Sequence, residues 1–288
     1  MTAVTASVVR LTPRVARVVA GNPGLMTGAG TNTYVLGRDE IAILDPGPAD
    51  PAHIERTLAC AREQNPEAAI RWVVVTHTHP DHSPAAALLA ERTGAELIGA
   101  TVVDDGNQDR SFKPPYSVQH GDLLVGRDFT LESIATPGHV GNHFCYLLRE
   151  EGMVFTGDHI MEGSTVVIVP PSGDMQDYLQ SLARLKTYPI RKLLPGHGDV
   201  MDDPIGVIDG LIAHRLRREE KVIRVLKGHG EMSLQQLTPL VYDDVDASLH
   251  PVAQLSLWAH LLKLEKEGRA HKQIEQHWLF GQQRWVLV

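Results

Sequence analysis

Residues 76–83, with the sequence THTHPDHS, carry three histidines and one aspartate in eight positions. They follow the apolar run IRWVVV, which is typical of a buried strand. His77 and His79 are two residues apart, and the proline after them prevents a helix, so both imidazoles can turn toward one point. Asp81 and His82 follow on the same turn. Imidazole and carboxylate ligands suit zinc, manganese or iron, and the lack of cysteine ligands argues against a closed structural zinc site.

Three further segments supply candidate partners for this cluster. His139 lies in TPGH, Asp158 in TGDH and His197 in LPGHG, each at the end of a strand-like run. Glycine in these turns lets the backbone bend sharply, so the three side chains can reach a shared centre. His159, next to Asp158, either supports that centre or simply packs. A histidine-rich surface loop is the competing interpretation, and the joint occurrence of these segments argues against it.

The H-x-H-x-D-H motif and its partners resemble the metallo-β-lactamase superfamily over about residues 15–200. The resemblance implies an α/β fold, an αβ/βα sandwich of two sheets flanked by helices, with a site for two divalent metal ions. The implied ligands are His77, His79 and His139 for the first ion, Asp81, His82 and His197 for the second, and Asp158 as a bridge. Zn²⁺ is the expected metal, because iron forms of the fold that reduce oxygen carry a glutamate where His79 stands. Mn²⁺ and Fe stay open.

Such a site implies hydrolysis. Two ions about 3.5–4 Å apart share a water, lower its pKa towards 7 and present hydroxide to an ester, thioester, amide or phosphodiester. Asp81, which would also orient the nucleophile, and Asp158 are the expected catalytic carboxylates. Asp45, at the end of IAILD, is predicted to hold a ligand histidine from behind, as metal-bound imidazoles usually require. A turn-capping role before Pro46 is the alternative.

The ligands need a scaffold that brings distant strand ends together. Apolar runs rich in β-branched residues predict strands at 33–37, 41–47, 71–77, 95–100, 128–138, 144–150, 152–158 and 192–198. Helical patterns cover 50–64, 83–94 and 174–188. Asp50 and Ser83 are the predicted capping residues of the first two helices, and Gly94 is the predicted stop of the second. This alternation favours an α/β sandwich.

The pattern changes after residues 202–204, DDP. A long amphipathic helix over 205–228, helices over 233–242 and 251–268, and strand-like segments around GQQ in 278–288 follow the order of a winged-helix module. Residues 1–204 hold 16 Lys and Arg against 25 Asp and Glu, whereas residues 205–288 hold 11 against 10. We predict a metallo-β-lactamase-like catalytic domain over 1–204 and a helical, winged-helix C-terminal domain over 205–288.

Two features of the sequence narrow the choice among branches of the superfamily. His197 lies only 39 positions after Asp158, which excludes the large insertion of the RNA-cleaving and polyadenylation-factor branch. NPGLMTGAGTNTYVLG, joined to a C-terminal winged helix, is most similar to the β-lactamase-like protein 2 group. Members of that group are hydrolases, and its animal form is regarded as a single-strand-specific endoribonuclease. The leading expectation is hydrolysis of a small ester, thioester or amide-type substrate. The alternatives are a single-stranded RNA endonuclease and a mono-iron persulfide dioxygenase that uses two histidines and an aspartate.

Two regions carry candidate contacts. The helical segment 251–272 has a modest basic edge of Lys263, Lys266, Arg269 and Lys272. This edge leaves the role of the C-terminal domain open: it packs on the catalytic domain, forms a homodimer, gates substrate access or contacts single-stranded RNA. The loop 102–122 is polar, and its Arg110, Lys113 and Tyr116 are candidate contacts to an anionic small-molecule substrate. An ordinary surface loop is the alternative.

Bulk composition sets further bounds. The 288 residues are 43% hydrophobic, with a formal charge of −8 and a pI near 6.0, which argues against bulk attraction to nucleic acid or anionic membrane. No run approaches the roughly 18 apolar residues of a membrane span. Cys60 and Cys145 fall in helical and strand patterns, so we expect buried thiols without a disulfide and a cytoplasmic protein.

Overall fold

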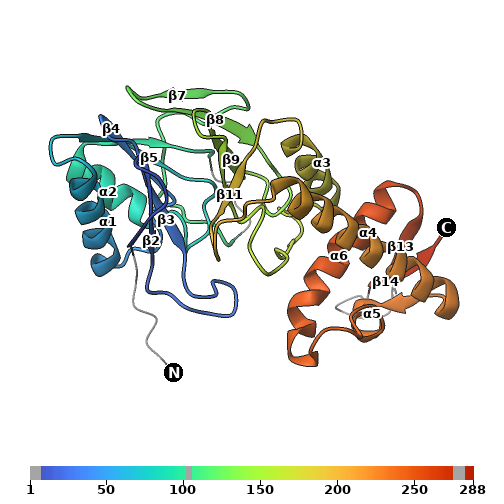
Figure 1. Cartoon of the computed structure of the whole chain (residues 1–288). Helices are drawn as coiled ribbons and strands as arrows, with labels where there is room; N and C mark the ends of the chain where they lie inside the picture. Colours follow the sequence, from blue (N-terminus) through green and yellow to red (C-terminus); the bar gives the residue numbers. More distant parts are fainter. Residues whose placement is uncertain (1–7, 102–105, 275–282) are drawn as a thin grey trace.

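The computed structural model describes residues 8–101, 106–274 and 283–288 (Figure 1). Within them, a first sheet has the order β1-β2-β3-β4-β5-β6, with strands Val8–Arg10, Val15–Val19, Asn32–Leu36, Glu40–Leu44, Ala69–Val74 and Glu96–Ile98. A second sheet has the order β11-β10-β9-β8-β7; in chain order from β7, its strands are Leu123–Val125, Thr130–Ala135, Phe144–Leu148, Met153–Gly157 and Lys192–Pro195.

The two sheets pack face to face. Their shared core contains Tyr34 and Phe155, whose ring centroids are 5.0 Å apart. Helices α1 (Pro51–Gln64) and α2 (Ala85–Thr93) cover the outer face of the first sheet. Helix α3 (Met175–Leu185) and the first half of α4 (Pro204–His229) cover the second sheet. The predicted αβ/βα sandwich is confirmed.

The C-terminal part is a winged helix built on its own core. It contains α4, α5 (Leu234–Val241), the short 3-10 helix η1 (Ala247–Leu249) and α6 (His250–Lys266). A small sheet of order β12-β14-β13 completes it, with strands Met232–Ser233, Gln283–Leu287 and Ala270–Ile274. Trp285 on β14 is fully buried against these helices. The predicted winged helix is confirmed.

Two details of the expected elements are wrong. Helix α6 ends at Lys266, and the segment expected to continue it instead turns at Gly268 (φ 69°) into β13. The first strand of the ribbon is therefore β13, whereas the strand expected at 278–280 lies outside the described residues. Ser83 does not cap α2, because its hydroxyl donates to Asp109 (2.7 Å), and Pro84 precedes the helix without a side-chain cap.

Other local expectations hold. The Asp50 carboxylate accepts hydrogen bonds from the first backbone N–H groups of α1, and Gly94 ends α2 in the left-handed conformation (φ 74°). Cys60 and Cys145 are free and buried. Among the described residues, no helix combines the length and apolar character needed to cross a membrane.

Candidate metal centre

The seven predicted ligands come from four strand ends. The loop after β5 carries His77, His79, Asp81 and His82, while His139, Asp158 and His197 follow β8, β10 and β11. Strands β10 and β11 are parallel, so their carboxyl ends meet at one edge of the second sheet. The side chains gather in two groups, each with its ligand atoms within 4.8 Å of one another: His77, His79, His139 and Asp158, and Asp81, His82 and His197.

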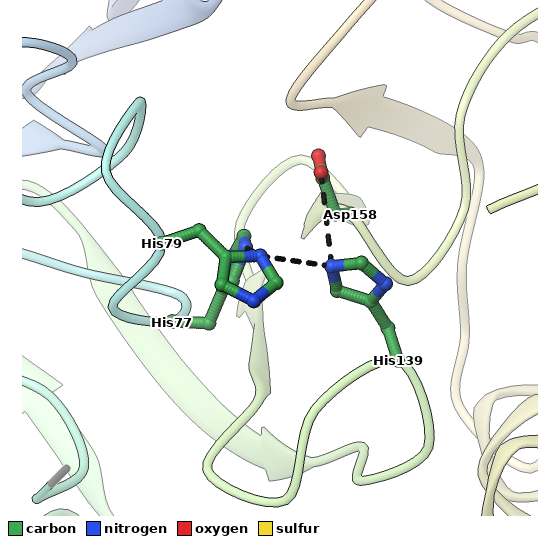
Figure 2. A group of neighbouring side chains, drawn as sticks. All are labelled: His77, His79, His139 and Asp158. Carbon is green, nitrogen blue, oxygen red and sulfur yellow. Dashed lines mark hydrogen bonds and ion pairs between the residues drawn. The ribbon is translucent and has the colours of Figure 1, made fainter. Parts of the chain in front are cut away.

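The first group is a ring of three imidazoles beside a carboxylate (Figure 2). Nδ1 of His79 lies 2.9 Å from Nε2 of His77 and 3.0 Å from Nε2 of His139. Oδ2 of Asp158 lies 3.9 Å from the same nitrogen of His139. Three imidazole nitrogens and one carboxylate oxygen thus converge, a donor set suited to a divalent transition metal.

The second group shares Asp158 with the first. Nε2 of His197 lies 3.2 Å from Oδ2 of Asp81 and 3.3 Å from Oδ1 of Asp158. Nε2 of His82 lies 3.4 Å and 3.2 Å from the same two oxygens. Because Oδ1 of Asp158 faces this group while Oδ2 faces His139, one carboxylate stands between the two groups.

Asp45 supports ligands of both groups from behind. Its Oδ2 lies 3.0 Å from Nδ1 of His82 and accepts the Thr76 hydroxyl at 2.8 Å. That hydroxyl oxygen lies 3.0 Å from Nδ1 of His77. Asp45 follows β4, is 1% exposed and has a positive φ of 48°, a conformation that costs a non-glycine residue energy. The strained turn points this carboxylate at the histidines.

Two further candidate ligands, His139 and His197, contact main-chain carbonyls through their Nδ1 atoms. Nδ1 of His139 lies 2.7 Å from the Val167 carbonyl, and Nδ1 of His197 lies 3.2 Å from the Gly30 carbonyl. The segment around Val167 is in turn held by the C-terminal part. Arg215 of α4 donates to the Val166 carbonyl, and Ser256 of α6 accepts from the Ile168 N–H.

Two glycines permit the close packing of the ligands. Gly157 has a φ of 46°, and a Cβ there would lie 2.4 Å from Oγ1 of Thr76. A Cβ at Gly196 would lie 2.7 Å from Cε1 of His82 and 2.8 Å from Oδ1 of Asp158. Any side chain at Gly196 would therefore displace two ligands.

The charges of the two groups fit bound cations. Burial lowers the pKa of His79 to about 4 and that of His77 well below its usual range, so both imidazoles are neutral, as ligands must be. Burial acts in the same direction on His82, but three surrounding carboxylates outweigh it and raise its pKa. Oδ1 of Asp158 and Oδ2 of Asp81 each lie within 3.4 Å of Nε2 of both His82 and His197. The second group thus brings two imidazoles and two carboxylates together at one point, a donor set that suits a divalent transition metal.

Comparison with known proteins assigns the family. Residues 26–197 match the metallo-beta-lactamase superfamily, and residues 233–278 match the beta-lactamase associated winged helix domain. The chain belongs to the metallo-β-lactamase superfamily. It is an enzyme, a hydrolase of this superfamily with an associated winged helix.

Sequence similarity to known relatives extends over most of the length of this hydrolase. A beta-lactamase-like protein 2 homolog from Caenorhabditis elegans is 33% identical over 90% of this chain and 86% of its own. An atrochrysone carboxyl ACP thioesterase from Cryptosporiopsis is 27% identical over 97% of this chain and 87% of its own. An atrochrysone carboxyl ACP thioesterase from Aspergillus fumigatus is 33% identical over 75% of this chain and 66% of its own.

Solved structures share the whole fold of the hydrolase. A metallo-beta-lactamase family protein from Thermus thermophilus superposes with a TM-score of 0.76, at 21% identity, over 97% of this chain and 100% of its own. A beta-lactamase domain protein from Burkholderia ambifaria superposes with a TM-score of 0.79, at 21% identity, over 98% of this chain and 95% of its own. These similarities extend through both the sandwich and the winged helix.

One buried histidine beside the centre escaped sequence reasoning. His143 stacks on His77, with ring centroids 5.0 Å apart, and lies 2.9 Å from the Thr136 hydroxyl through its Nδ1. The only signal was its position four residues after His139. His159 is also buried, but its ring lies against Tyr178, 4.9 Å between centroids, which favours the packing interpretation.

A cavity of about 670 Å³ adjoins the second group at His197. It lies between the sandwich and the helices of the winged-helix part, and includes Asn32 and Gly30 near the ligands. The predicted substrate contacts Arg110, Lys113 and Tyr116 are exposed and do not line it. A role for these three residues stays a prediction.

Proposed function

We propose that this protein is a binuclear metal-dependent hydrolase, with two divalent cations, Zn²⁺ in the first place, that cleaves a small thioester or related ester or amide. One observation carries the proposal: the two oxygens of Asp158 face two separate ligand groups, beside a cavity of ligand size. His77, His79 and His139 would hold one cation, Asp81, His82 and His197 the other, and Asp158 both.

Bound there, two cations supply activation of a shared water and polarisation of the attacked carbonyl. The side chains around the cations would position the attacking water and the ligand histidines. Asp81 accepts the Thr31 hydroxyl at 3.2 Å, and its partly exposed carboxylate orients the attacking water. Asp45 keeps Nδ1 of His82 occupied, so Nε2 of that ring stays available as a ligand.

Two observations support a thioester substrate: the names of two relatives, and a cavity beside the candidate ligands that is large enough for an acyl group. Two relatives named as ACP thioesterases match this chain over 97% and 75% of its length. The adjoining cavity of about 670 Å³ lies within the range of roughly 300–1,000 Å³ typical of small-molecule sites. An acyl group can therefore enter beside the ligands without rearrangement of the fold.

A substrate panel tests this proposal. Metal-reconstituted protein should hydrolyse thioesters faster than lactones, lactams or phosphodiesters. His77→Ala and Asp158→Ala should abolish turnover, because each removes a ligand, whereas His229→Ala at the exposed end of α4 serves as the control and should not. Turnover of either ligand variant at the parent rate would sink the proposal.

Single-stranded RNA cleavage remains the second candidate, and charge pairing weighs against it. The basic edge is neutralised: Lys263 pairs with Glu219 and Glu267, Lys266 with Asp174, Arg269 with Glu219 and Glu267, and Lys272 with Glu265. RNA binding normally depends on unpaired cations that displace counterions. Steep salt dependence of RNA binding, together with cleavage, would favour this candidate.

The mono-iron dioxygenase alternative is separated by a different measurement. It uses a single iron per chain and consumes oxygen, whereas the proposed hydrolase uses two ions and no oxygen. Iron content and oxygen uptake with a persulfide substrate therefore decide between them, and we expect no uptake.

A further inference from the structure

The cavity beside the metal centre is walled by both parts of the chain. From the sandwich come the loop at residues 25–30, the segment 161–167 and the turn at His197. From the winged helix come α4, α6 and the stretch between α5 and α6. Figure 1 shows α4 running from the sandwich beside α3 to the C-terminal helices. The winged helix thus forms one side of a space that reaches a ligand histidine.

Most of the wall is apolar. Its apolar side chains include Leu25, Met26, Met161, Val166, Leu249 and Ala253. Leu25 and Met26 at the tip of their loop are 75% and 50% exposed, although large apolar side chains gain by burial. A bulky apolar ligand in the cavity would cover them.

Among the residues that the structure describes, no carboxylate pairs with one of the cations in this wall. Arg17 pairs with Asp199 at 2.8 Å, and Arg218 makes a bidentate pair with Asp244. Arg215 is only 3% exposed, and its contacts are the Val166 carbonyl and the ring of Tyr178, 5.3 Å from the guanidinium carbon. Its Nε has no hydrogen-bond partner. Buried charges are ordinarily paired, so an anion from outside the chain is the missing partner.

Two further polar atoms in the wall are unsatisfied. Tyr242 is 7% exposed, and its hydroxyl has no hydrogen-bond partner in the described part of the chain. The buried Nδ1 of His214 has none there either. Both residues line the cavity together with Arg215. The hydroxyl and the guanidinium N–H are donors, and donors in an apolar wall call for ligand oxygen atoms. Of the two carboxylates in the wall, Glu162 lies against Gly198 and Asp199 pairs with Arg17.

We propose that this cavity holds the acyl part of the substrate, and that this acyl part is a bulky, mostly apolar group carrying an acidic oxygen that pairs with Arg215. The placement of the reacting carbonyl at the His197 end rests on the proposed function. Arg215 and Tyr242 then determine specificity, and the winged helix is a substrate-binding wall.

Binding of non-hydrolysable compounds to the metal-loaded protein tests the assignment without catalysis. The probes are naphthoate and naphthalenedicarboxylate, which differ by one carboxylate, measured by titration calorimetry. Arg215→Met should reduce the preference for the dicarboxylate about tenfold or more, because a charge-assisted hydrogen bond is lost. Arg224→Met, on the exposed face of α4, is the matched control and should keep the preference. Equal weakening of both probes by Arg215→Met would mean that Arg215 only supports Val166, which overturns the proposal.

A second variant fills the space. Ala253→Trp on α6 should lower kcat/KM for a naphthoyl thioester at least tenfold more than for an acetyl thioester, because the indole occupies the acyl volume. Ala90→Trp on α2, half-buried and outside the cavity, is the control. An unchanged ratio would contradict the assignment. If no thioester is hydrolysed but dicarboxylate binding depends on Arg215, the cavity stands and the proposed function fails.

Discussion

At the scale of single residues, Asp45 links the two groups of the candidate metal centre. It accepts a hydrogen bond from Nδ1 of His82 directly and reaches Nδ1 of His77 through the Thr76 hydroxyl. One histidine of each ligand group is thereby held with its Nδ1 protonated and its Nε2 available. The cost is a left-handed backbone conformation at a buried carboxylate.

We predict that Asp45→Asn weakens metal binding about 10–100-fold, the usual effect of losing such a supporting carboxylate. Competition with a chromophoric chelator measures this. Asp50→Asn, at the start of α1 and outside the ligand groups, is the control, because asparagine also caps helices well. Equal metal affinity of Asp45→Asn and the parent protein would show that Asp45 serves only its turn.

At the scale of elements, the segment Val166–Ile168 connects the winged helix to the metal centre. The Val167 carbonyl lies against His139, while Arg215 of α4 and Ser256 of α6 bind the residues on either side. The winged helix therefore supports His139, a candidate ligand that belongs to the sandwich.

Replacing Ser256 with alanine should loosen this segment. The buried Ile168 N–H loses its partner, which costs about 1–3 kcal/mol of unfolding free energy. Denaturant unfolding measures the loss, and kcat should fall with it because His139 is less well held. Ser248→Ala, whose hydroxyl bonds only within an exposed turn, should change neither. Unfolding free energies that agree between Ser256→Ala and the parent would refute the supporting role.

The strand-end positions of the candidate ligands and the layered fold were predictable because they rest on local signals. Histidine and aspartate after apolar runs mark strand ends, and Asp45 shows the same signature. What escaped prediction depends on contacts between distant segments. Ser83 looks like a helix cap but donates to Asp109, and Arg215 looks like one of several solvated cations but is buried in a cavity wall. Only the folded arrangement distinguishes these residues from their neighbours in sequence.

At the scale of the whole molecule, the C-terminal part carries a buried titratable group of its own. Burial lowers the pKa of His260 to about 4, assisted by Arg215 and Lys263 and opposed by Glu219. The unfolded chain binds the proton near its ordinary value of 6.5, so the neutral imidazole contributes stability that is present above pH 6.5 and is lost as the pH falls toward 4.

We predict that the unfolding free energy falls between pH 6.5 and pH 4, by on the order of 3 kcal/mol from this residue. His260→Leu should flatten that part of the profile, because leucine does not titrate. His229→Leu, on the surface, should follow the parent profile. Denaturant titrations at a series of pH values test this, and equal slopes for His260→Leu and the parent would contradict it.

The number of metal ions per chain tests the binuclear centre most directly. Elemental analysis of gently purified protein should give two divalent ions per chain, because Asp158 stands between two complete ligand groups. His197→Ala should retain about one ion, since the group of His77, His79 and His139 is untouched. One ion or fewer in the parent protein under metal-replete conditions would contradict the two-metal hydrolase.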